Sequence, residues 1–274
     1  MFDTVIEMLS YPFMTRAFLV GSLVALCSAL LGVSLVLKRY SMIGDGLSHV
    51  GFGAMAIAAA MNAAPLTVAI PVVIVAAILL LRISGNAKIK GDAAIALIST
   101  TSLAVGVMVI SLTTGMNTDV YNYMFGSILA MSAEDVKLSL VLSVFVLILF
   151  IVFYHKIFAI TFDETFARAT GVKAGVYNTL IAVLTAVTIV LGMRMMGELL
   201  FSSLIIFPAL TSVRVCRTFK SVIINAAVIS VVCLIAGVTL SYVAATPAGA
   251  SVVLANLVMM VLYTVVGAVK NHMR

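Results

Sequence analysis

The chain has 274 residues, of which 64% are hydrophobic and only 9% are charged, and its mean hydropathy is +1.27. Soluble domains carry about 25% charged residues, so this composition excludes an ordinary soluble protein and predicts an integral membrane protein. The formal net charge of +6 does not indicate nucleic-acid binding, because the basic residues gather in the connections between apolar runs.

The first eleven residues predict a short amphipathic helix lying on the membrane surface. Apolar side chains recur at helical spacing from Phe2 to Leu9. A secretory signal peptide would begin with a basic region, whereas this segment carries Asp3 and Glu7 and no small-residue cleavage site follows it.

Several charge-free runs approach or exceed the roughly 20 residues that cross a bilayer as a helix. Splitting them at turn signals predicts nine spans, one of which, at 198–213, has only sixteen residues. We therefore predict an all-α polytopic membrane protein with eight or nine transmembrane helices in one domain, residues 1–274. The alternation typical of a membrane β-barrel is absent from the sequence. The nine spans are 13–37, 43–62, 65–82, 92–112, 135–155, 175–195, 198–213, 221–242 and 250–269.

The Lys and Arg residues predict the orientation of these spans. With the N-terminus outside and the C-terminus inside, only Arg16, Lys137 and Arg194 of the sixteen basic residues face outward, and thirteen face the cytoplasm. Such an excess on one side is the positive-inside signal of membrane proteins.

Two connections are more than simple turns. Residues 117–134, on the outer side, are too apolar for a solvated loop and predict a short helix at the outer face. The inner loop, residues 156–175, contains a stretch that begins with two acids and ends with a base and a glycine. These features predict a short capped helix on the inner face, suited to docking a cytoplasmic partner.

Ionisable residues inside a membrane are costly and therefore mark candidate functional sites. Asp45 and His49 are four apart, so they share one face of a helix, with Ser48 beside them. A carboxylate and an imidazole suit zinc, manganese or ferrous iron. In the alternative interpretation, Asp45 caps its helix, His49 is a packing residue, and the glycines at 44, 46, 51 and 53 serve a structural interface.

Glu198 is a weaker candidate, because at the outer end of its span it could reach water or Arg194. One Asp and one His supply only two ligands, so a metal site would need more. A homodimer with Asp45 and His49 near its two-fold axis would supply two of each.

Other chemistry finds little support in the sequence. The chain contains no G-x-x-x-x-G-K-[ST], H-E-x-x-H or G-x-S-x-G motif, so it is not predicted to bind ATP through a P-loop or to act as an enzyme. Cys27, Cys216 and Cys233 lack paired spacing and are expected to be packing residues. A gradient-driven secondary metal transporter or channel remains the alternative, although no inverted repeat is visible.

The sequence resembles the zinc, manganese and iron permeases of the ABC-3 family in six ordered blocks. The second block contains the run Ile43-Gly44-Asp45-Gly46-Leu47-Ser48-His49. Departures from the family pattern are Glu198, Gly91-Asp92 and the missing proline after the histidine. The blocks span residues 11–17, 37–49, 119–130, 161–172, 197–209 and 246–253.

This resemblance implies the permease subunit of an ATP-driven metal importer in the bacterial inner or cytoplasmic membrane, with a type II importer fold. It implies a permease dimer, cytoplasmic ABC ATPases, an extracytoplasmic metal-binding protein, and no permanently bound cofactor. Asp45 and His49 would line the path of the ion, with zinc slightly favoured over manganese. Contact with the ATPases would fall on the inner helix, at Asp163, Glu164, Phe166, Arg168 and Gly171.

Overall fold

The computed structural model describes residues 10–84, 91–113 and 133–272, and within these ranges it contains eleven helices and no strand. Each of the nine predicted spans coincides with a helix, which confirms the all-α prediction for this part of the chain. The predicted surface helix at 1–11 and outer-face helix at 117–134 lie almost wholly outside the described residues. The helices are α2 (Pro12–Leu37), α3 (Ser41–Ala60), α4 (Pro65–Ser84), α5 (Gly91–Thr113), α7 (Ala133–Val152), α8 (Tyr154–Phe162), α9 (Glu164–Ala169), α10 (Ala174–Met196), α11 (Glu198–Val215), α12 (Phe219–Ala244) and α13 (Ala248–His272).

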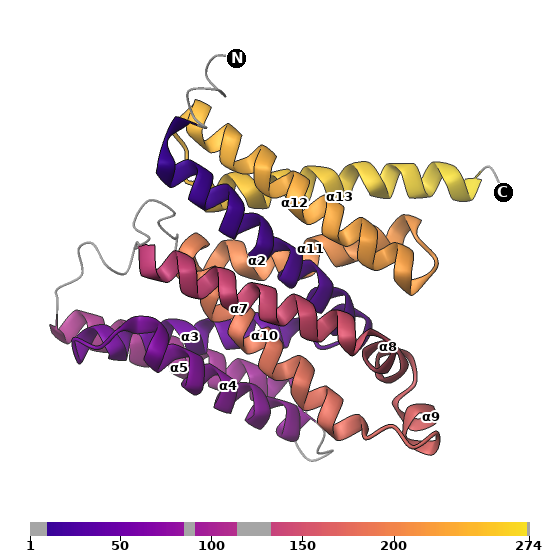
Figure 1. Ribbon diagram of the computed structural model, residues 1–274, viewed down its shortest axis with the longest axis horizontal. Coiled ribbons are helices and arrows are strands. Elements are labelled where there is room, and N and C mark those ends of the chain that lie inside the picture. The colour runs from indigo at the N-terminus through magenta and orange to yellow at the C-terminus, as the bar shows by residue number, and fades with distance from the viewer. Residues whose placement is uncertain (1–9, 85–90, 114–132, 273–274) are drawn as a thin grey trace.

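The helices form a bundle in which α2, α10 and α11 occupy the middle (Figure 1). Helices α3, α4 and α5 pack together on one side of this centre, and α12 and α13 pack on the other. Most of α2 and α3 is buried within the chain, whereas less than a third of α4, α5 and α13 is buried. Apolar side chains on the outside of a bundle suit contact with lipid or with another membrane subunit.

Among the described residues, seven helices are long and apolar enough to cross a membrane, and the bent pair α7–α8 makes an eighth candidate. The shorter apolar helix at Leu200–Val215, within α11, corresponds to the short span expected at 198–213. The described helices therefore agree with eight or nine spans.

The connection after α7 differs from the predicted loop at 156–175. The chain bends by 69° after α7 and continues as helix α8, so much of the expected loop is helical. Ile157 and Ile160 are buried against the bundle, and Phe158 lies with its ring centroid 5.2 Å from that of Phe219. Apolar residues at helical spacing beside a buried surface explain why this segment folds as a helix.

Glycines let α3 approach its neighbours closely. A Cβ added to Gly53 would lie 2.7 Å from the Ser102 carbonyl oxygen of α5, and one added to Gly46 would lie 2.6 Å from the Ile95 side chain. Gly44 similarly faces Ile205 of α11. In membranes, where burial in lipid competes with burial in protein, such close contact between small residues is a main source of helix association.

A methyl group at Gly53 is predicted to destabilise the protein. Because the obstructing atom is backbone oxygen, Gly53→Ala should cost about 1–3 kcal/mol through overpacking. The matched control is Gly175→Ala, where the added Cβ meets nothing within 4 Å; its stability should be unchanged or higher by up to about 1 kcal/mol. Thermal unfolding of the detergent-purified chain measures both, and equal melting temperatures would contradict the close contact.

Candidate functional site

Helix α3 presents Asp45 and His49 on one face, one turn apart. Asp45 Oδ2 lies 3.8 Å from His49 Nε2, and the two side chains keep 43% and 24% of their surface exposed. The surrounding part of α3 is largely buried. These are partly open polar side chains on an apolar helix, in the arrangement expected from their spacing.

Helix α11 brings a second acid to the same place. The chain turns at Gly197, whose φ of 83° falls in the left-handed region that favours glycine, and Glu198 then begins α11. The sequence suggested that Glu198 could reach water or Arg194; instead its side chain is only 4% exposed, and Oε1 lies in close contact with His49 Nδ1.

Two serines bond Asp45 in different ways. The Ser202 hydroxyl donates to Asp45 Oδ1 across 3.0 Å, which joins α11 to α3. Ser48 is buried, and its hydroxyl donates a hydrogen bond of 2.7 Å to the Asp45 backbone carbonyl of its own helix. The sequence analysis missed Ser202, although its spacing of four from Glu198 places both on one face of α11.

The cluster offers an ion two ligands on one chain. Two ligand atoms bound to one tetrahedral ion at 2.0–2.2 Å stand about 3.4 Å apart, so Asp45 Oδ2 and His49 Nε2 need to approach by only a few tenths of an ångström. Among the described residues no group of three His, Cys, Asp or Glu side chains is arranged to hold a metal ion. The site is therefore open and incomplete within one chain.

Helix α9 is the short capped helix expected after residue 163. The Asp163 carboxylate accepts a hydrogen bond of 2.8 Å from the Phe166 N–H, which satisfies a free donor at the first turn. Gly171 follows the helix with a φ of 84°. The Phe166 side chain projects outward with 66% exposure, and Arg168 is similarly exposed.

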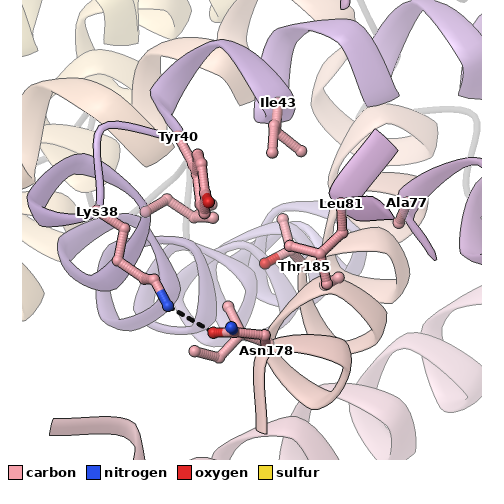
Figure 2. Close-up of a pocket in the computed structure, with 10 residues that line it drawn as sticks. Lys38, Tyr40, Ile43, Ala77, Leu81, Asn178 and Thr185 are labelled. Atoms are coloured by element: carbon pink, nitrogen blue, oxygen red, sulfur yellow. Dashed lines mark hydrogen bonds between the residues drawn. The ribbon is translucent and has the colours of Figure 1, made fainter. Parts of the chain in front are cut away.

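A partly buried ion pair ties α9 to the junction between α2 and α3. Lys38 Nζ lies 3.4 Å from Glu164 Oε2 and also donates to the Asn178 amide oxygen of α10. Figure 2 shows Lys38 and Asn178 joined in this way beside a pocket whose wall includes Tyr40 and Ile43. Asp45, His49 and Glu198 do not line this pocket.

The ionisation of this pair follows from its surroundings. Burial raises the pKa of Glu164, but hydrogen bonds from Asn178 and Arg168 and the charge of Lys38 outweigh it, so the pKa is lowered overall. Burial lowers the pKa of Lys38, and Glu164 offsets part of that cost. Because the Glu164 pKa is depressed on folding, its contribution to stability is present at neutral pH and is lost as the pH falls through its folded pKa.

The chain folds as a bundle of apolar helices, with ionisable side chains on its inner helices and a capped helix outside it. This arrangement is typical of a polytopic membrane protein of the transporter type. The sequence matches the model of the ABC 3 transport family over residues 10–267, so the chain belongs to this family.

Individual relatives and a solved structure agree with this assignment. The chain is 28% identical to the manganese transport system membrane protein MntC of Halalkalibacterium halodurans, covering 90% of this chain and 85% of the relative. It is 30% identical to the high-affinity zinc uptake system membrane protein ZnuB of Haemophilus influenzae, covering 90% and 94%. The solved structure of PsaBC from Streptococcus pneumoniae in complex with Fab superposes with a TM-score of 0.86 at 26% identity, covering 95% of this chain and 94% of that chain. The predicted type II ABC importer permease fold is confirmed.

Glu164 pairs with both Lys38 and Arg168, and the two pairs are predicted to contribute different amounts to the free energy of unfolding because they differ in burial. Lys38 is 8% exposed and Arg168 is 65% exposed. Lys38→Ala should cost about 1–3 kcal/mol of stability at neutral pH, since it strands partly buried polar groups. Arg168→Ala should cost less than about 1 kcal/mol, as for other exposed pairs.

Thermal unfolding between pH 7 and pH 3.5 measures this difference. The loss of stability in the Lys38→Ala variant, relative to the wild type, should shrink as the pH falls below about 4.3, the ordinary pKa of a glutamate. Protonated Glu164 no longer pairs with Lys38 in the wild type, so less remains for the substitution to remove. Equal losses for the two variants would contradict the role assigned to burial.

Proposed function

We propose that this chain is the membrane-spanning permease subunit of an ATP-driven importer of divalent transition-metal ions. The observation that carries the proposal is the geometry of Asp45 and His49, which lie 3.8 Å apart and partly exposed on a helix otherwise buried in the bundle. Membership of the ABC 3 transport family supports it, as do relatives named for manganese transport and zinc uptake.

The incomplete ligand set suits transport. A site with four protein ligands would hold zinc tightly, whereas two ligands and water release it more readily. A second copy of the chain, with its α3 helix near a two-fold axis, would supply two further ligands during passage. We place zinc slightly ahead of manganese, because the block at 246–249 resembles the zinc branch of the family slightly more; a carboxylate and an imidazole can serve either ion.

We further propose that α9 docks a cytoplasmic ABC ATPase and that an extracytoplasmic protein delivers the ion. The excess of basic residues on one side supports an outside N-terminus and an inside C-terminus, which puts α9 in the cytoplasm. ATP binding and hydrolysis in the ATPase would then move α9, and the Lys38–Glu164 pair would pass this movement to the α2–α3 junction.

Replacing either ligand is predicted to abolish transport. Asp45→Ala and His49→Ala should each reduce uptake of radiolabelled zinc and manganese to background, since either leaves a single ligand. The matched control is Ser28→Ala, a buried serine of α2 whose hydroxyl donates to the Val24 carbonyl of its own helix; it should transport normally. All variants are compared at equal membrane abundance, and normal uptake by both ligand variants would remove this site from the proposal.

Removing the exposed aromatic side chain of α9 is predicted to uncouple the ATPase. Phe166→Ala should prevent co-purification of a P-loop ATPase and ATP-dependent uptake while leaving the fold intact, because large aromatic side chains dominate the energy of interfaces. Leu112→Ala, at an exposed apolar residue of α5, is the matched control. Uptake that continues without any ATPase would instead favour a gradient-driven transporter or channel.

A further inference from the structure

Helices α3 and α11 meet through two matched pairs of polar side chains. On α3 the pair is Asp45 and His49, and on α11 it is Glu198 and Ser202, each pair four residues apart. Ser202 bonds Asp45, while Glu198 contacts His49. Since the later residue on one helix meets the earlier residue on the other, the two helices run antiparallel here, and each member of the candidate site has a partner on α11.

The side chains of the cluster differ in exposure, so one side of the cluster is open and the other is buried. Exposure is 43% for the Asp45 side chain, 24% for His49 and 4% for Glu198. An ion that reaches the cluster from the open side therefore meets Asp45 and His49 first. Glu198 lies behind the imidazole ring, away from the approaching ion.

The buried carboxylate has little else to contact. No hydrogen bond from another described residue reaches either carboxylate oxygen of Glu198. Burial of a polar group without partners is unfavourable, so the contact with the ring nitrogen of His49 is the main compensation that the described residues give Glu198. The N-terminal position in α11 adds a smaller favourable interaction with the helix dipole.

We propose that Glu198 is the positioning residue of this site: it accepts the Nδ1–H of His49 and thereby keeps Nε2 turned toward Asp45 and free to bind the transported ion. The inference rests on the proposed function of Asp45 and His49 as ion ligands. A carboxylate that holds the second nitrogen of a ligand histidine sets its tautomer and ring orientation, and its loss typically lowers metal affinity 10–100-fold.

The same geometry argues against Glu198 as a third ligand. Its oxygen faces Nδ1, whereas Asp45 faces Nε2, and the two nitrogens lie on different edges of the ring. An ion bound at Nε2 is therefore turned away from Glu198. The described residues also lack a cluster of three such donors.

Transport kinetics test the proposal through two substitutions at the same position. Glu198→Leu removes the acceptor and should raise the KM for zinc uptake about 10–100-fold. Glu198→Gln is nearly isosteric and keeps an oxygen acceptor for Nδ1–H, so its KM should rise much less. The matched control is Ser203→Ala on α11, a buried serine whose hydroxyl bonds Leu200 of its own helix; its KM should equal that of the wild type.

Nitrogen NMR of the full chain provides a readout that does not require transport. The chain has three histidines, so labelled His49 can be assigned by substituting His155 and His272. His49 Nδ1 should carry a proton in the wild type and in Glu198→Gln, and the two tautomers should mix in Glu198→Leu. A purely structural role for Glu198 would leave the tautomer unchanged.

The outcomes separate this inference from the proposed function. Inactive Asp45→Ala together with a wild-type KM in Glu198→Leu would overturn the positioning role alone. Equal loss in Glu198→Gln and Glu198→Leu, with Nδ1 still protonated in the Gln variant, would also overturn it in favour of a direct ligand. Normal uptake by Asp45→Ala would instead remove the underlying site, whatever the tautomer.

Discussion

A hydrocarbon environment offers no hydrogen-bond partners, so the chain must satisfy its polar groups internally. The backbone does so by folding as helices, and many hydroxyls bond carbonyls of their own helix. Ser28, Thr188 and Ser212 each donate to the carbonyl four residues earlier, at 2.7–2.8 Å. The Lys38 and Glu198 side chains have no such local solution, because their own helices offer no oppositely charged residue within one turn. Each buried charge therefore requires a partner from another helix, and these partners hold the functional parts of the bundle together.

The site depends on close packing as much as on charge. Glycines on α3 let neighbouring helices come close: Gly53 faces the backbone of α5, and the other three face side chains of α5, α10 and α11. Gly32 plays a similar part on α2, where an added Cβ would lie 2.1 Å from the Ile205 carbonyl oxygen of α11. The contact of Gly44 with Ile205 limits the distance between α3 and α11, on which the contact of Glu198 with the imidazole depends.

The second buried charge, on Lys38, connects the bundle to α9. Lys38 is the C-terminal cap of α2, Arg39 adopts a left-handed φ of 61°, and α3 begins at Ser41. Glu164 on α9 and Asn178 on α10 therefore bind Lys38, which lies three residues before α3, the helix that carries Asp45. A displacement of α9 would have a short covalent route to Asp45 and His49, which is the physical basis of the coupling that we propose.

The sequence by itself determined the class of fold, the positions of the spans and the pairing of Asp45 with His49. These follow from composition, from the length of apolar runs and from the period of the helix, all of which are local. It also predicted the cap of α9, because Asp163 and Gly171 act within a few residues. Only the tertiary structure decided that α8 bends onto the bundle, that Lys38 reaches Glu164, and that Glu198 lies behind His49 with Ser202 against Asp45. The contacts of Lys38, Glu198 and Ser202 join residues more than a hundred positions apart, and all of these features depend on how closely the helices approach, which no local pattern specifies.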